Sequence, residues 1–211
     1  KKMNKEKLAI FWFRRDLRLE DNHGLFQALT SGFKVLPIFI FDPHILNQFE
    51  DKQDRRVDYI MQVLKNIDQK LIPFQSGIEV FFKPPVEAFE ELTTQYNIEM
   101  VCCNHDYEPK AIRRDAEVEI HLKNKKIAFK SFKDQVQFEK NDILKADESP
   151  YTVFTPYAKK WKLKLQAQGL PYFYSENNLN QLVEKSDFKK YSLETIGFQK
   201  TAMDFTEPQI E

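Results

Sequence analysis

Charged side chains crowd into a short segment near the start of the chain, where they could hold an anion or form one wall of a cofactor pocket. Residues 14–22 read Arg-Arg-Asp-Leu-Arg-Leu-Glu-Asp-Asn and directly follow an apolar run. Arginine presents several donors in a fixed planar array, which suits phosphate and carboxylate oxygens. The same composition also suits a network of Arg–Asp pairs that ties a loop to the next helix. Both interpretations stay open.

Two further segments carry polar or aromatic groups just after apolar runs. In residues 104–109, Asn-His-Asp-Tyr-Glu-Pro, Asp106 and Glu108 stand two residues apart before an expected helix start, where carboxylates are favoured by the helix dipole. As a pair facing a crevice, they would accept hydrogen bonds from a heterocycle's N–H or from ribityl hydroxyls. Residues 39–43, Phe-Ile-Phe-Asp-Pro, suit a flat ring or, equally, a hydrophobic core.

The sequence shows no catalytic arrangement. No serine stands in a Gly-x-Ser-x-Gly motif, and no metal-site spacing joins the four histidines, His23, His44, His105 and His121. The chain has only 5 glycines and lacks both Gly-x-Gly-x-x-Gly and Gly-x-x-x-x-Gly-Lys-[Ser/Thr], which excludes standard dinucleotide and phosphate-binding loops. We therefore predict neither a catalytic residue nor a metal ligand.

Composition points to one sizeable domain with a well-solvated surface. Hydrophobic residues make up 42% of the 211 positions, and Lys+Arg and Asp+Glu both number 32. A formal charge of zero argues against a domain that binds nucleic acid on its own. No apolar run approaches the length of a membrane helix, about 18 residues or more, and no secretory signal opens the chain. Cys102 and Cys103 are neighbours in an apolar run, and neighbours in a strand point to opposite faces of the sheet. We therefore expect reduced core thiols on opposite faces and a cytoplasmic protein.

Apolar runs alternate with helical periodicities between residues 8 and 132. The predicted strands are 8–13, 35–41, 78–82, 99–104 and 127–132, and the predicted helices are 22–30, 53–71, 85–96 and 109–123. This alternation predicts an α/β fold, a doubly wound five-stranded parallel sheet with right-handed crossovers and helices on both faces. Because Pro37 lacks a ladder donor, we expect it near a strand start or at a bulge.

Ligands of such sheets bind beyond the carboxyl ends of the strands, at the topological switch point. The three segments described above follow predicted strands and therefore belong to this edge. Arg56, on the helix 53–71, could reach the same crevice, although a single arginine is more often a solvated surface charge.

The alternation stops after residue 132. Residues 133–150 are polar and irregular, residues 155–168 predict a short basic helix, and residues 169–211 carry scattered apolar side chains without a further core. Such a tail is unusual in a free-standing domain and is typical of a connector. We therefore expect an α/β domain at 1–132 and an interdomain connector at 133–211. The basic helix would contact a domain outside these residues, or form a solvated face above Trp161.

Three ordered motifs resemble the DNA photolyase and cryptochrome family. They are residues 11–22 (FWFRRDLRLEDN), residues 104–109 followed by Arg113-Arg114-Asp115, and residues 150–156 (PYTVFTP) followed by Lys160-Trp161. Together they span nearly the whole chain but only the N-terminal part of the family's pattern. The resemblance implies a Rossmann-like antenna domain, whose pigment passes excitation to FAD in a helical domain that is absent from these 211 residues.

For the parent protein the resemblance implies light-driven DNA repair. In the family, photoexcited reduced FAD donates an electron to a cyclobutane pyrimidine dimer flipped out of UV-damaged DNA; the ring splits and the electron returns. The parent would be a lyase that binds DNA through the missing domain, and the basic helix 155–168 could contact that domain or the DNA. The fragment alone would be an inactive monomer without a membrane partner. Two alternatives stay open, the same domain of a cryptochrome photoreceptor and a stand-alone nucleotide-binding module.

The resemblance also implies a pigment site. In members that use a deazaflavin or flavin, the pigment lies in the crevice at the strand ends, and the matching positions here are Phe39, Ile40, Phe41, Arg56, Asp106 and Glu108, together with Arg15. Members that use methenyltetrahydrofolate tend to carry an Asn-Glu pair after the second motif, where this chain has Lys110-Ala111. The resemblance therefore favours a deazaflavin or flavin, or an empty pocket, over methenyltetrahydrofolate.

Overall fold

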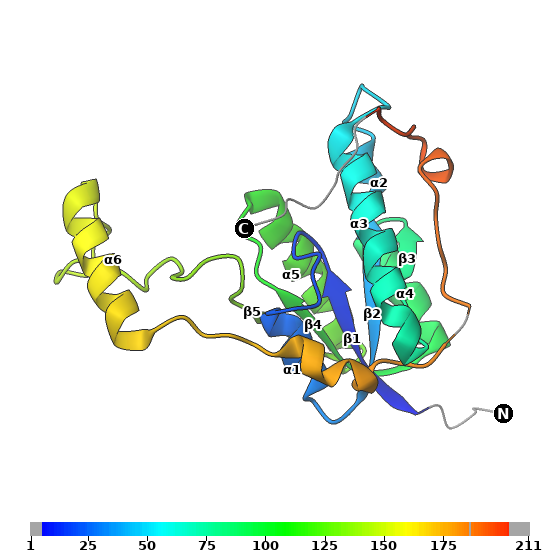
Figure 1. The fold of residues 1–211 in the computed structure, drawn as a ribbon, viewed down its shortest axis with the longest axis horizontal. Coiled ribbons are helices and arrows are strands. Elements are labelled where there is room, and N and C mark those ends of the chain that lie inside the picture. The colour runs from blue at the N-terminus through cyan, green and yellow to red at the C-terminus, as the bar shows by residue number, and fades with distance from the viewer. Residues whose placement is uncertain (1–5, 186, 203–211) are drawn as a thin grey trace.

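Five parallel strands form the centre of the chain in a computed structural model that describes residues 6–185 and 187–202. They are β1 (Lys7–Phe13), β2 (Lys34–Phe41), β3 (Glu79–Phe82), β4 (Asn97–Asn104) and β5 (Ala128–Phe132). Their order is β3-β2-β1-β4-β5, and every pairing is parallel. The predicted doubly wound sheet is confirmed (Figure 1), and its switch point lies between β1 and β4.

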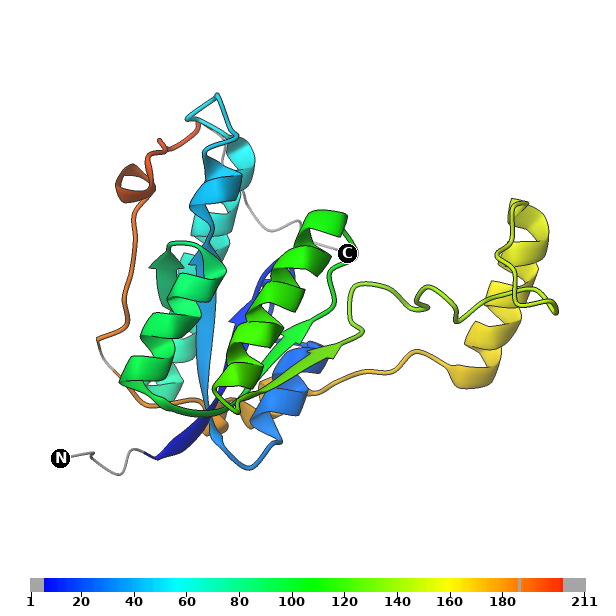
Figure 2. The same cartoon turned by 180° about the vertical axis from the view of Figure 1, so that it is seen from behind.

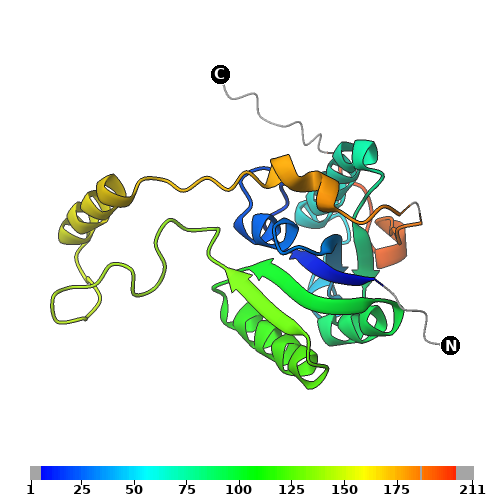
Figure 3. The same ribbon diagram turned by 90° about the horizontal axis from the view of Figure 1, so that it is seen from below.

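Helices cover both faces of the sheet (Figure 3). One layer contains α1 (His23–Leu29) and α3 (Arg55–Leu71), and the other contains α4 (Pro85–Gln95) and α5 (Pro109–Asn124). The short α2 (Pro43–Leu46) and the 3-10 turn η1 (Ile72–Phe74) flank α3 in the chain. None of the described helices is long and apolar enough to cross a membrane.

The strands read as continuous apolar runs because both of their faces are buried. In β1, Phe11 and Phe13 join the core under α1 and α3, whereas Trp12 joins the core under α4 and α5. The neighbouring Cys102 and Cys103 divide between the same two cores and form no disulfide. Burial raises the pKa of Cys102 to about 11 and that of Cys103 to about 12. The prediction of core thiols on opposite faces is confirmed.

Pro37 corrects one expectation, because it lies inside β2 and the β1–β2 register passes through it without a shift. The carbonyl of Val35 accepts from the N–H of Val183 at 2.9 Å, on the side of β2 away from β1. Backbone groups two residues apart point to the same side of a strand, so the missing donor of Pro37 also faces away from β1. On that side the β3 ladder begins only at Ile38.

The predicted connector, 133–211, has two structural parts. The basic helix α6 (Phe154–Gln168) stands away from the sheet (Figure 2), and none of its residues is buried. The chain then returns through the 3-10 turns η2 (Ser175–Gln181) and η3 (Glu194–Ile196). This returning part buries five apolar side chains in the core under α1 and α3: Leu179, Leu182, Leu193, Ile196 and Phe198. Positions 1–5 of the predicted domain, and 186 and 203–211 of the connector, lie outside the described residues.

Candidate functional site

A buried polar network anchors the loop after β1. Asn104, at the end of β4, donates from Nδ2 to Asp16 Oδ2 at 2.5 Å and to Asn22 Oδ1 at 2.8 Å, and its Oδ1 accepts from the N–H of Gly24 at 2.7 Å. All three side chains are buried, and burial raises the pKa of Asp16. A Cβ on Gly24 would lie 2.6 Å from Asn104 Oδ1, so this approach requires glycine. The network fixes the path of the loop across the switch point.

A second set of contacts joins the same loop to α5. Arg14 Nη1 donates to both oxygens of Asp115, at 2.6 and 2.5 Å, and Arg114 pairs with that carboxylate at 2.8 Å. The guanidinium carbons of Arg14 and Arg114 lie 5.2 and 5.0 Å from the Trp12 ring centre, within cation–π range. Within the described part of the chain, Nη2 of the buried Arg14 has no hydrogen-bond partner. One donor of this arginine is left unsatisfied.

Arg15 spans the switch point from the loop after β1 to the loop after β4. Its Nη2 lies 2.7 Å from Glu108 Oε2, and its Nε lies 3.5 Å from Asp106 Oδ2. The hydrogen bond to Glu108 raises the pKa of Arg15. The carboxylate of Asp106 is buried, whereas the side chains of Arg15 and Glu108 are 55% and 61% exposed. The structure therefore brings three of the predicted site residues together, with the arginine joining the two carboxylates.

A cavity of about 390 Å³ opens on the other side of this loop, against α3. The loop contributes residues 14–18, and the helix contributes Arg56, Tyr59, Ile60 and Val63. The volume lies within the range of small-ligand sites, roughly 300–1,000 Å³. The lining combines four arginines and one aspartate with an apolar stripe of the helix. Such a lining suits a planar ligand that carries anionic or carbonyl oxygens.

Arg56 is oriented by two residues that precede α3 in the chain. Its Nε and Nη2 donate to the two oxygens of Asp54, at 3.0 and 2.6 Å, and its guanidinium lies 4.3 Å from the centre of the Phe49 ring. Asp54 is also the N-cap of α3 and accepts from the backbone N–H of Arg56 at 2.9 Å. The hydrogen bond from Arg56 lowers the pKa of Asp54. The cation at the cavity is thus held in one direction although its side chain is 69% exposed.

The other predicted site residues lie in the hydrophobic cores. Phe39 and Phe41 meet edge to face, with ring centres 4.8 Å apart, in the core under α1 and α3. Ile40 points into the opposite core. Among the described residues, none of these three, nor Asp106 or Glu108, belongs to the lining of the cavity.

Sequence reasoning missed the apolar wall that α3 gives to the cavity. Arg56, Tyr59, Ile60 and Val63 follow the spacing i, i+3, i+4 and i+7, which places them on one face of a helix. This face lies beside the core stripe that contains Val57. The spacing of these four residues on the predicted helix 53–71 is the signal in the sequence for this face.

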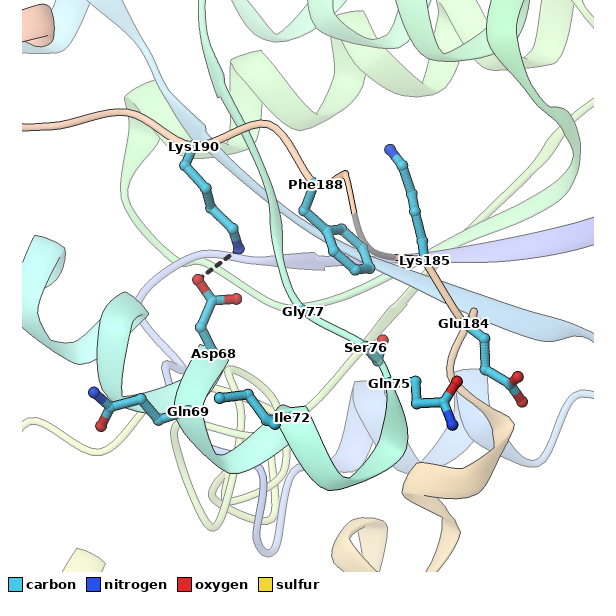
Figure 4. Close-up of a pocket in the computed structure, with 10 residues that line it drawn as sticks. All are labelled: Asp68, Gln69, Ile72, Gln75, Ser76, Gly77, Glu184, Lys185, Phe188 and Lys190. Atoms are coloured by element: carbon cyan, nitrogen blue, oxygen red, sulfur yellow. Dashed lines mark hydrogen bonds and ion pairs between the residues drawn. The ribbon is translucent and has the colours of Figure 1, made fainter.

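A larger cavity, of about 690 Å³, lies at the other end of α3 beneath the connector (Figure 4). Its lining balances two lysines against two carboxylates. Lys190 pairs with Asp68 at 2.5 Å, and Lys185 pairs with Glu79 at 2.6 Å. The charged residues that line this cavity have a net charge of zero. Ligands of doubly wound sheets bind at the carboxyl edge of the strands, and this cavity lies away from that edge. The smaller, cationic cavity is therefore the candidate site.

Comparison with known proteins gives consistent results. A family model described as DNA photolyase matches residues 9–175. A deoxyribodipyrimidine photo-lyase of Synechococcus sp. is 34% identical over 162 residues, which cover 77% of this chain and 32% of that protein. The chain thus spans about a third of the length of this curated relative.

Two solved structures extend the comparison. An archaeal photolyase from Sulfolobus tokodaii, solved with two FAD molecules and described as implying a novel light-harvesting cofactor, is 31% identical with a TM-score of 0.56. The match covers 63% of this chain and 32% of that one. The cryptochrome of Synechocystis sp. PCC6803 has a TM-score of 0.75 at 18% identity, over 96% of this chain and 42% of that one. The second likeness is one of fold alone.

Proposed function

This chain belongs to the DNA photolyase family, and we propose that it is the N-terminal antenna part of a light-driven DNA repair enzyme. The observation that carries the proposal is the cationic cavity between the loop after β1 and α3, which lies within the residues that the family model matches. A pigment held there would absorb light and pass its excitation to FAD. The residues of this chain bind and orient the pigment and contribute no reacting group.

The chemistry of the cavity lining supports a deazaflavin or flavin as the pigment. Arg15 and Arg56 would hold the ring carbonyl or phosphate oxygens of the pigment, and Tyr59, Ile60 and Val63 would pack against its ring system.

The remaining predicted residues act indirectly in this proposal. Asp106 and Glu108 would position the guanidinium of Arg15. Phe39, Ile40 and Phe41 would support the sheet edge from within the cores. Two observations favour a flavin-type pigment over methenyltetrahydrofolate: the Lys110-Ala111 sequence and the likeness to a photolyase solved with two FAD molecules.

For the whole protein we infer cleavage of cyclobutane pyrimidine dimers in UV-damaged DNA by reduced FAD, in the cytoplasm. The support is the 34% identity to a deoxyribodipyrimidine photo-lyase, of which this chain spans about a third. The FAD and the DNA would be bound by a helical domain that follows the connector. A cryptochrome photoreceptor is the second candidate, because a plant cryptochrome, Cryptochrome-2 of Arabidopsis thaliana, is 31% identical over 159 residues.

Fluorescence titration of this chain tests the pigment site. The pigments are FAD, 8-hydroxy-5-deazariboflavin and methenyltetrahydrofolate. We expect a flavin or deazaflavin to bind, and Arg15→Ala and Arg56→Ala each to weaken binding about tenfold, as expected for the loss of a charge-assisted hydrogen bond. The matched control Lys185→Ala removes a cation from the larger cavity and should leave the affinity unchanged. Selective folate binding, or wild-type affinity in both arginine variants, would contradict the assignment.

Repair of dimer-containing DNA by the full-length protein tests the activity. Reduced, FAD-loaded protein should restore the DNA under blue light and not in the dark. Bound, reduced FAD without repair would favour the cryptochrome. Micromolar ATP binding by this chain, without pigment binding, would instead favour a stand-alone nucleotide-binding module.

A further inference from the structure

The last described part of the connector returns to α3. We call residues 193–201 the return segment. Leu193, Ile196 and Phe198 are buried in the core that α3 also joins, and the N–H of Gln199 donates to the carbonyl of Lys52 at 2.8 Å. In Figure 1 this segment is coloured orange to red and ends near the loop that precedes α3. The return segment therefore contacts the helix that forms one wall of the candidate site.

Asp58, in the first turn of α3, anchors the return segment. Its Oδ2 accepts from both the N–H and the hydroxyl of Thr201, each at 2.8 Å, and its Oδ1 accepts from Gln62 at 3.0 Å. The residue is 1% exposed. Burial acts against its charge, but the hydrogen bonds from Gln62 and Thr201 outweigh burial and lower the pKa of Asp58. The buried carboxylate thus depends on the return segment for two of its hydrogen bonds.

A second contact leads from the return segment to the cavity through Phe49. The ring centres of Phe198 and Phe49 lie 6.3 Å apart, edge to face, and Phe49 also contacts the guanidinium of Arg56, which lies 4.3 Å from its ring centre. Nζ of Lys52 lies 4.9 Å from the Phe198 ring centre. One aromatic ring therefore separates the return segment from the cation of the cavity.

Helix geometry connects the two contacts. With 3.6 residues per turn, residues two apart project to nearly opposite sides of a helix. Arg56 faces the cavity, and Asp58 of the same turn faces the return segment. Any displacement of this turn moves both groups together.

We propose that the return segment is part of the antenna site, with Asp58, Thr201 and Phe198 as positioning residues for the Arg56 wall. Pigment affinity then depends on the docking of the return segment. Because linkage is reciprocal, a bound pigment favours the docked return segment by the same factor. This inference rests on the proposed pigment site.

Three conservative variants test the proposal in this chain, with FAD or 8-hydroxy-5-deazariboflavin as the probe. Thr201→Val removes the hydroxyl donor to Asp58, and we expect three- to tenfold weaker binding. Thr201→Ser keeps that donor and should bind within twofold of wild type. Phe198→Leu keeps an apolar side chain but removes the ring contact with Phe49, and it should also weaken binding severalfold.

Thermal unfolding separates positioning from general stability. The control Lys185→Ala removes a different connector contact, the pair with Glu79 of β3, and should lower the Tm without changing the affinity. Wild-type affinity in Thr201→Val and Phe198→Leu, at a lowered Tm, would overturn the proposal.

Hydrogen exchange distinguishes this inference from the proposed function. In Thr201→Val, amides 59–63 of α3 should exchange several times faster, while those of 67–71 keep their rates. If no pigment binds to the wild type, the proposed function fails, and the exchange rates alone decide whether the return segment holds this wall. Unchanged exchange at 59–63 would overturn the inference.

Discussion

The loop after β1 has an arginine–aspartate pair on each side, and the two pairs differ in burial rather than in distance. Toward α5, Arg14 and Asp115 approach to 2.5 Å with side chains 7% and 16% exposed. Toward the cavity, Arg56 and Asp54 approach to 2.6 Å, but Arg56 is 69% exposed. Exposed pairs contribute little to stability, whereas a buried charge that loses its partner costs several kcal/mol. The buried pair of Arg14 and Asp115 therefore stabilises the fold, whereas the exposed pair leaves the guanidinium of Arg56 accessible to a ligand.

This difference in burial explains how a loop that presents charged side chains to a cavity can have a fixed backbone. The buried side of the loop, with Arg14 and Asn104, fixes the backbone on which Arg15 stands. The arginines on the exposed side contribute little to the stability of the fold and remain accessible to a ligand. The following predictions test this division, from the largest expected effect to the smallest.

Asp115→Ala should lower the free energy of unfolding by about 3 kcal/mol, because it leaves the buried guanidinium of Arg14 without its partner. Urea denaturation measures the change. Asp115→Asn keeps an acceptor and should lose less. A loss below about 1 kcal/mol would show that the pair contributes no more than an exposed one.

Asn104→Ala should cost about 2 kcal/mol. It removes two hydrogen bonds donated by Nδ2 and leaves the buried N–H of Gly24 without an acceptor. The matched control is Asn178→Ala, because Asn178 is only partly buried and its side chain donates to a backbone carbonyl at 3.2 Å. Equal losses of stability in the two variants would contradict a special role for the buried network.

Arg56→Ala should have the smallest effect on stability while weakening pigment binding. Because Arg56 lowers the pKa of Asp54, the contribution of the pair is present above the ordinary aspartate pKa of 3.8. It is lost as the pH falls through the lowered value. Denaturation curves of wild type and variant should therefore differ slightly at pH 7 and converge in strong acid. A difference that grows on acidification would reverse the assigned sign.

Most of the fold was predictable because its signals are local. A strand buried on both faces is a short apolar run, and an amphipathic helix repeats every 3.6 residues. The parallel order of the strands then places their carboxyl ends at one edge. For this reason the edge positions of Arg15, Asp106 and Glu108 followed from the sequence, as did the burial of Cys102 and Cys103 in two different cores.

Only the tertiary structure decided which of these groups meet. It joined Arg15 to Asp106 and Glu108 and placed the open cavity on the α3 side of the loop. It also brought Thr201 to Asp58, 143 residues earlier in the chain. Such contacts depend on how helices and connector pack against the sheet. A side chain's local sequence shows its chemistry and its face, but the distance to a partner is determined by the packing of the whole chain.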